Sequence, residues 1–295
     1  MATEPIIKTF TLLTPAFVHG AYQSQQNNRP ELRPPSVKGQ LHWWYAALFG
    51  QERDGHAGKD ELELFGHVSD RRRGLEGNEA SLFSIRVIEE TLQETKADVL
   101  PHKKREGLQG TKAALAPGSR FTLQLLPRRQ GPKPEQWQRL QRATEAWLLL
   151  GGIGQRANRA AGSLWPEDAP ETSLDYEREA GELLAGSKLR FALLEGTWST
   201  EDKLRSDVSD ILSDQAMAHC GRPFGTAGDS REQLARKPSP LKLRAVRFGG
   251  QLRVVAVWDA RHASGDLKEG VRVLKDARKP LGVLLAPVVE KLLNV

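Results

Sequence analysis

The stretch "PEQWQRLQRATEAWLLLGGIGQRANRAAGSLWP", residues 134–166, joins a helix, a glycine-rich loop and a short strand in one continuous run. Residues 134–150 carry apolar side chains at helical spacing, and the pair of glycines that follows is typical of a helix end. Residues 162–166 then predict a short strand. A helix that leads into a final strand closes a βαββαβ unit, so this run predicts the end of such a unit.

The preceding residues contain the other elements of that unit. The sequence predicts strands over 6–18, 81–90 and 120–129, and a helix over 36–49. Two prolines precede Ser36, which we expect to cap this helix. The complete order is strand, helix, strand, strand, helix, strand, which is that of a ferredoxin-like domain.

A second half follows the first. Residues 166–186 are acidic and interrupted by proline, and we interpret them as the connection between the halves. Beyond them the sequence predicts an apolar segment over 188–196 and a helix over about 200–219. A hairpin over 241–260 turns at Gly249-Gly250. The second half therefore also combines strands with a helix.

The fold class that these patterns predict is α+β, with two tandem ferredoxin-like (RRM-like) domains. Each domain is expected to have an antiparallel sheet with helices on one face. Residues 1–170 are predicted to form the N-terminal domain with the glycine-rich loop, and residues 171–295 the C-terminal domain. A chain of 295 residues is long enough for two domains of ordinary size.

The composition limits the classes of function. The chain has 43 Lys and Arg against 37 Asp and Glu, and the resulting charge of +6 favours an anionic partner. A single cysteine, Cys220, excludes an internal disulfide and a zinc clamp, so we expect no metal and a reducing, cytoplasmic setting. Neither a secretory signal pattern nor an apolar run of membrane-spanning length is evident. We expect no membrane partner and no cofactor.

The tandem tryptophans of the helix over 36–49 differ in their predicted roles. Trp44 continues the apolar stripe of this helix, which predicts that it is buried. Trp43 points away from the stripe, between the small residues Gly39 and Ala46 on its own face. A base of single-stranded RNA can stack on such an indole. The alternative is that Trp43 packs on a second element, such as the other half of the protein.

Cations lie close to these tryptophans in the sequence. Arg33 and Lys38 are candidates to contact phosphate, and His42 is adjacent to Trp43.

The glycine-rich loop is a second candidate RNA contact. Gly152 and Gly154 allow the backbone to approach a phosphodiester closely. The alternative is a glycine helix end followed by an ordinary solvated loop. A dinucleotide-binding motif is excluded because the glycines follow a helix rather than a strand. The side chains that could donate to phosphate are Gln155, Arg156, Asn158 and Arg159.

A third candidate is the basic segment that leads into the predicted hairpin. It contains Arg236, Lys237, Lys242 and Arg244, and strand alternation puts the last two on one face. These cations could bind RNA, or they could form a solvated strand face.

Signals for catalysis are sparse. No metal-binding histidine spacing, nucleophile elbow or phosphate-binding loop occurs. His19 and His42 lie near the proposed RNA contacts, and either could act as a general base on a ribose 2′-hydroxyl. A structural role is the alternative for each.

Three of these segments together resemble a known family. "LRPPSVKGQLHWW" (32–44), "LLLGGIGQRANRAAGSL" (148–164) and "RKPSPLKLR" (236–244), in this order, resemble the RAMP superfamily of CRISPR proteins. Within it they are most similar to the first-numbered RAMP subunits of the type III-B (Cmr) effector complex. The resemblance implies tandem ferredoxin-like domains and a role in binding RNA rather than cutting it. The residues that match the family's RNA-facing motifs are Lys38, Trp43, Trp44, Gly151, Gly152, Gly154, Arg156, Arg159 and Gly162.

One position departs from the family pattern. His42 stands where an arginine often precedes the tryptophans, which removes a fixed positive charge and weakens the case for phosphate contact there.

The function expected from the residues and the resemblance is that of a non-catalytic RNA-binding subunit of a type III-B effector complex in antiviral defence. It would hold the 3′ region of the crRNA, the target RNA, or both. Its expected partners are single-stranded RNA and other effector subunits. One alternative is a metal-independent RAMP endoribonuclease that processes crRNA, with His19 or His42 as the base. The other is a structural adaptor that contacts only neighbouring subunits.

Overall fold

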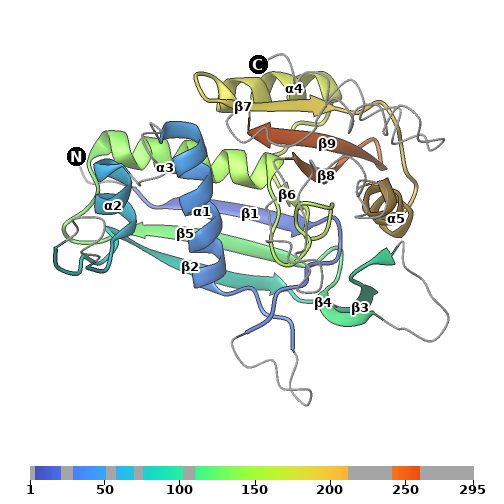
Figure 1. Cartoon of the computed structure of the whole chain (residues 1–295), viewed down its shortest axis with the longest axis horizontal. Coiled ribbons are helices and arrows are strands. Elements are labelled where there is room, and N and C mark those ends of the chain that lie inside the picture. The colour runs from blue at the N-terminus through green and yellow to red at the C-terminus, as the bar shows by residue number, and fades with distance from the viewer. Residues whose placement is uncertain are drawn as a thin grey trace, which may run out of the picture.

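A computed structural model of the chain describes residues 4–20, 29–50, 58–69, 76–101, 110–211 and 241–259. Its elements follow one another as Figure 1 shows. Those of the first half are β1 (Ile6–Leu12), α1 (Pro34–Phe49), α2 (Lys59–Phe65), β2 (Phe83–Thr91), β3 (Glu94–Asp98), β4 (Thr111–Leu115), β5 (Arg120–Pro127), α3 (Pro134–Leu150) and β6 (Leu164–Pro166). Those of the second half are α4 (Ser173–Leu184), β7 (Leu189–Leu193), α5 (Glu201–Ile211), β8 (Leu241–Phe248) and β9 (Gln251–Asp259).

The first sheet has the strand order of a ferredoxin-like domain. Its four strands lie in the order β2-β5-β1-β6, and every neighbouring pair is antiparallel. In the register of the central pair, Phe10 of β1 lies opposite Phe121 of β5. Because side chains alternate along a strand, this register gathers the apolar residues of β1 and β5 on one face.

That apolar face is covered by α1 and α3. The rings of Phe10 and Phe121 stack 5.7 Å apart, and Trp147 of α3 meets Phe10 edge-on at 6.2 Å. Trp44 of α1 is 1% exposed and belongs to the same core. The helices pack directly on each other as well as on the sheet. The structure confirms the predicted burial of Trp44.

The second sheet repeats part of the same topology. Its strands lie in the antiparallel order β7-β9-β8, and α5 lies between β7 and β8 in the chain. The first unit arranges β1, α1, β2 and β5 in the same way. The α+β class with antiparallel, ferredoxin-like sheets is therefore confirmed. The last strand and helix of a second unit would fall in residues 260–295, which lie outside the described residues. The predicted domain boundary at residue 170 stays a prediction.

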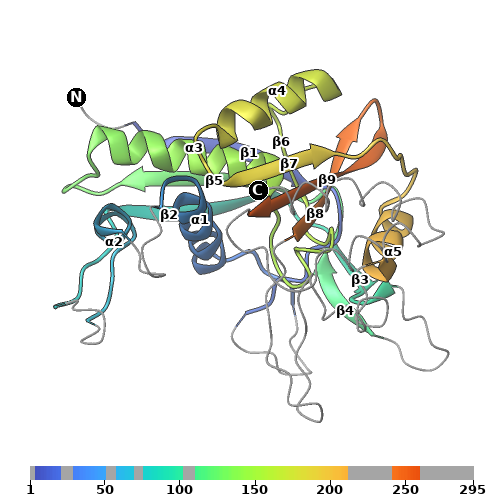
Figure 2. The same ribbon diagram turned by 45° about the horizontal axis from the view of Figure 1, so that its top comes forward.

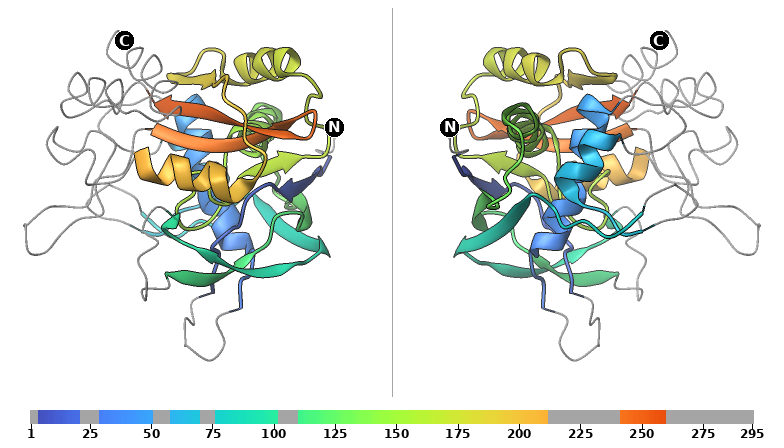
Figure 3. Two further views of the ribbon diagram at one scale, coloured as in Figure 1. Left: turned by 90° about the vertical axis from the view of Figure 1, so that its right-hand side faces the viewer. Right: turned by 90° about the vertical axis from the view of Figure 1, so that its left-hand side faces the viewer.

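The two halves pack closely together. The second sheet lies beyond the β6 edge of the first sheet, and β6 contacts β8 (Figure 3). Phe248 of β8 meets the rings of Trp165 and Tyr176 edge-on at 5.7 and 5.4 Å. Val246 of the same strand is buried in the core that also contains the helices of the first half. The apolar core is continuous across both halves.

A buried arginine makes a second link between the halves. Arg205 of α5 donates to the carbonyl oxygen of Asp98 at the end of β3, at 2.5 Å. Its guanidinium also lies 5.3 Å from the ring centroid of Phe17. Figure 2 shows α5 beside the β3–β4 hairpin. The hairpin is thus held between the exit of β1 and the second half.

Three local predictions need correction, and one hairpin was missed. The strand predicted over residues 6–18 ends at Leu12. Helix α1 begins at Pro34, with Arg33 at the N-cap position, so Ser36 is not the cap. Two prolines fit the first turn because their missing N–H groups have no helical partner there. Residues 166–186 are not a plain connection, because they contain α4, which Thr172 caps by accepting from the Asp175 amide at 3.1 Å. The β3–β4 hairpin was not predicted at all.

Candidate nucleic-acid interface

The glycine-rich loop, residues 151–163, is held rigidly by the rest of the chain. The Gln155 amide donates to the carbonyl oxygen of Phe17 at 2.9 Å, which ties the loop to the exit of β1. On its other side, the Ala160 amide donates to the carbonyl oxygen of Leu243 at 3.0 Å, and the Leu243 amide donates to Asn158 at 3.2 Å. The loop therefore joins β1 to β8, and it is not an ordinary solvated loop.

Its glycines are required by the chain's own packing. A Cβ at Gly154 would lie 2.7 Å from the carbonyl oxygen of Phe17, and one at Gly162 would lie 2.0 Å from that of Ile153. Both residues also have positive φ angles, +88° and +57°. Gly152 is buried in this conformation, and the approach of a phosphodiester to its backbone stays a prediction. Gly151 is extended rather than left-handed, so it is not a glycine cap of the usual kind.

The polar side chains of the loop differ in exposure. Gln155 is exposed, and Lys112 of β4 lies 3.5 Å from its side-chain oxygen. Arg156, Asn158 and Arg159 are partly buried. Arg156 has a φ of +63°, which is uncommon outside glycine, and such strained residues cluster at functional sites. The predicted donors thus share one fixed loop.

Trp43 meets the second half of the protein. Its ring packs edge-on against Trp44 at 5.2 Å, and the ammonium of Lys242 in β8 lies 4.1 Å from its ring centroid. This contact matches the predicted alternative in which Trp43 packs on another element. Trp43 remains partly exposed, whereas Trp44 is buried, and the RNA contact that the resemblance implied for each stays a prediction.

Two cations lie on one face of β8, Lys242 partly buried and Arg244 almost fully buried. Burial, followed by the positive charge of Arg244, lowers the pKa of Lys242 to about 8, while the charge of Asp259 acts in the opposite direction. Arg244 is 3% exposed, and burial also lowers the pKa of its guanidinium. The Nη1 group of Arg244 donates to the carbonyl oxygen of Leu243 at 2.9 Å, whereas its Nε has no hydrogen-bond partner. Arg244 is therefore part of the junction between the halves rather than a solvated strand face.

The remaining basic candidates lie at the start of α1 or outside the described residues. Lys38 is partly buried, and burial followed by the charge of Arg128 lowers its pKa. Arg33 is also partly buried, and its Nε has no hydrogen-bond partner. Arg236 and Lys237 fall in the range 212–240, outside the described residues.

The two candidate histidines have different surroundings. Among the described residues, His19 has no hydrogen-bond partner for either ring nitrogen, and burial followed by the charge of Lys112 lowers its pKa. A neutral imidazole of this kind can accept a proton. His42 lies 2.5 Å from the carboxylate of Glu61, and its ring packs at 4.7 Å from that of Phe65. These contacts favour the structural alternative for His42.

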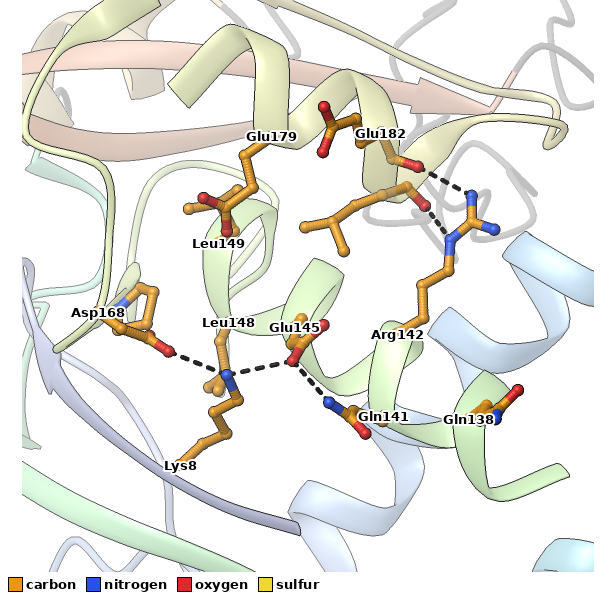
Figure 4. Close-up of a pocket in the computed structure, with 12 residues that line it drawn as sticks. Lys8, Gln138, Gln141, Arg142, Glu145, Leu148, Leu149, Asp168, Glu179 and Glu182 are labelled. Carbon is orange, nitrogen blue, oxygen red and sulfur yellow. Dashed lines mark hydrogen bonds and ion pairs between the residues drawn. The ribbon is translucent and has the colours of Figure 1, made fainter. Parts of the chain in front are cut away.

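A cavity of about 590 Å³ lies elsewhere, between α3, α4 and β1 (Figure 4). Lys8 bridges Glu145 and Asp168 at 3.1 and 2.9 Å in this cavity. Burial, then the charges of Asp168 and Glu145, raise the pKa of Glu179 on its wall. Arg142 does not neutralise these carboxylates, since it donates to the carbonyl oxygens at the end of α4. A cavity with this excess of carboxylates is unsuited to RNA phosphate.

The described residues limit two other kinds of function. No group of three or more His, Cys, Asp or Glu side chains among them is arranged to hold a metal ion. None of the helices in the described part of the chain combines the length and apolar composition that crossing a bilayer requires.

The strand order and the loop after α3 define a class of protein, namely ferredoxin-like units that carry a glycine-rich loop. The model of the RAMP superfamily matches residues 9–165, which is more than half of the 295 residues. The chain belongs to the RAMP superfamily. No curated protein matches it in sequence.

Solved structures show the same fold at low sequence identity. The crystal structure of Cmr1 from Pyrococcus furiosus in its apo form is 19% identical, with a TM-score of 0.56 over 87% of this chain and 88% of that chain. A chain in the cryo-EM structure of the type III-B Cmr-beta, bound to cognate target RNA and AMPPnP in the presence of ssDNA, is 10% identical. Its TM-score is 0.56 over 98% of this chain and 99% of that chain.

Proposed function

We propose that the chain is a non-catalytic RNA-binding subunit of a type III-B CRISPR effector complex, acting in the cytoplasm. Its partners are the crRNA, the target RNA, or both, together with neighbouring effector subunits. Membership of the RAMP superfamily supports the proposal, and so does the fold shared with a chain of an RNA-bound Cmr-beta complex. Sequence selection is delegated to guide pairing, so the subunit needs to hold the backbone rather than read bases.

The observation that carries the proposal is the fixed glycine-rich loop. Residues 151–166 contain two arginines and no carboxylate, and main-chain hydrogen bonds hold the loop between β1 and β8. A loop that main-chain hydrogen bonds fix in this way suits a phosphate backbone, because little conformational entropy is lost on binding.

The test is a titration of labelled single-stranded RNA with the full chain. We expect Arg156→Ala and Arg159→Ala each to weaken binding about tenfold, as loss of a charge-assisted hydrogen bond does. Arg178→Ala is the matched control, since Arg178 is exposed on α4 and paired with Asp175 at 2.8 Å. Unchanged binding by both loop variants would remove the loop from the RNA contact.

The surroundings of His19 keep an endoribonuclease as the second candidate function. A denaturing gel of the same samples separates the two candidates. Intact RNA supports the non-catalytic subunit. Cleavage that is lost in His19→Gln, without loss of binding, supports the nuclease instead. A structural adaptor would bind a neighbouring subunit and show no RNA affinity of its own.

A further inference from the structure

One side of α1 remains open next to Trp43. Gly39 lies one helical turn before Trp43 on the same face and is exposed. A Cβ at Gly39 would meet no heavy atom within 4 Å, so the chain's own packing does not require a glycine there. Glycine in a helix interior costs about 1 kcal/mol relative to alanine. This position therefore differs from the loop glycines, each of which avoids an internal collision.

Lys242 covers the indole of Trp43. Its ammonium lies 4.1 Å from the ring centroid, and Asp259 is the described carboxylate whose charge acts on it. The nearby Arg244 is buried on the same strand, with its Nε unpartnered. Two like charges on one strand that are shielded from water, Lys242 in part and Arg244 almost fully, repel each other, and an anion between or beside them stabilises both. The indole face offsets only part of this effect.

A ligand that fits this arrangement supplies an anion and a flat ring. The anion would satisfy the ammonium of Lys242, and the ring would replace that ammonium on the indole of Trp43. The open space at Gly39 admits a backbone close to the helix. A nucleotide is a ligand class that has a phosphate, a planar base and a slender connecting sugar.

We propose that Trp43, Gly39 and Lys242 bind one unpaired nucleotide of single-stranded RNA, with the base on the indole, the phosphate on the Lys242 ammonium and the sugar-phosphate chain crossing Gly39. This nucleotide site rests on the proposed function, and it adds to that function a second RNA contact away from the glycine-rich loop. Trp43 comes from the first half and Lys242 from the second, so the bound nucleotide links the two halves. Lys242 leaves the indole when the base arrives.

The experiment measures the affinity of the full chain for labelled single-stranded RNA in four variants. Trp43→Leu removes the stacking surface, and Lys242→Met keeps the side chain's length without its charge. Gly39→Gln fills the open space. We expect each to weaken binding about tenfold, in the range found for loss of one stacked base. Lys242→Arg keeps the charge and is expected to bind within about threefold of the wild type.

A variant at a second glycine serves as the control for effects on folding. Gly181 of α4 is also exposed inside a helix and has no heavy atom within 4 Å of its Cβ position. Gly181→Gln should leave RNA affinity unchanged. Glutamine is the better helix former, so neither glycine variant should lower the thermal unfolding midpoint. Weaker binding in Gly39→Gln alone therefore reports contact with RNA.

A second readout locates the nucleotide directly. RNA carrying 5-iodouridine is irradiated with the wild-type protein, and the crosslinked peptide is identified by mass spectrometry. We expect the crosslink at Trp43. Wild-type binding that Arg156→Ala weakens, but that the Trp43, Gly39 and Lys242 variants do not, would overturn this site and leave the proposed function standing. Absence of RNA binding by the wild type would overturn both.

Discussion

At the scale of single residues, Lys242 is expected to oppose folding near neutral pH. Its folded pKa of about 8 lies below the ordinary value of 10.5. Below pH 8 the lysine is charged in both states, so the folded protein carries the full unfavourable effect of burying the charge. Between pH 8 and pH 10.5 the lysine is protonated in the unfolded chain but largely neutral in the folded protein, so the free energy of unfolding rises with pH. Above pH 10.5 the lysine is neutral in both states, and the unfavourable effect disappears.

Replacing this charge should therefore stabilise the protein. We expect Lys242→Met to raise the free energy of unfolding at pH 7 by up to about 3 kcal/mol, from the size of the pKa shift. The gain should shrink steadily as the pH approaches 10.5. Denaturant unfolding at several pH values measures it. A gain that does not change with pH would mean that repacking, and not the charge, is responsible. Higher stability with weaker RNA binding is typical of a group retained for function.

A substitution at Gly162 tests how much the stability of the protein depends on the backbone conformation and close packing of the glycine-rich loop. We expect Gly162→Ala to destabilise the protein by at least about 3 kcal/mol, because the new Cβ would both strain the backbone and meet the Ile153 carbonyl at 2.0 Å. Gly249→Ala is the matched control: its φ of +54° is close to the +57° of Gly162, but nothing lies within 4 Å of its Cβ position. The control should cost about 1 kcal/mol. Equal effects in thermal unfolding would show that strain alone matters.

At the scale of elements, strand alternation and helical periodicity were sufficient for the first unit. Helix α3 and strand β5 match the predicted ranges closely, because each buries one regular face. Helix α4 was missed because its flanking prolines were interpreted as breakers, although both precede the helix. The pair Thr172 and Asp175, three residues apart, is an N-cap signal that could have located it.

The β3–β4 hairpin shows a different limit. Its strands carry charged residues such as Glu94 and Lys112, and their burial alternates weakly. The register with Leu115 opposite Glu94 is held instead by neighbours distant in sequence, including the exit of β1. A period-two pattern is faint in such strands, so sequence alone could not predict them.

At the scale of the whole molecule, the contacts that define the candidate interface join the two halves. The sequence indicated Trp43 and Lys242 separately, but their contact depends on how the second sheet docks beyond β6. Local periodicity contains no information on that docking. Arg205 is a second example. It is a charged residue of an amphipathic helix, and nothing in the sequence indicated that it would be buried over the ring of Phe17. Composite sites of this kind need the tertiary structure.

The salt dependence of RNA affinity can distinguish contacts to phosphate from stacking on a base. For single-stranded nucleic acid, each neutralised phosphate adds about 0.7 to the slope of log affinity against log salt. We expect Arg156→Ala and Lys242→Met each to lower that slope by about 0.7, because each removes one phosphate contact. Trp43→Leu should weaken binding at every salt concentration and leave the slope unchanged, since stacking releases no counterion. A slope in Lys242→Met equal to that of the wild type would place its ammonium away from phosphate. Parallel slopes in all three variants would attribute their effects to stacking or folding rather than charge.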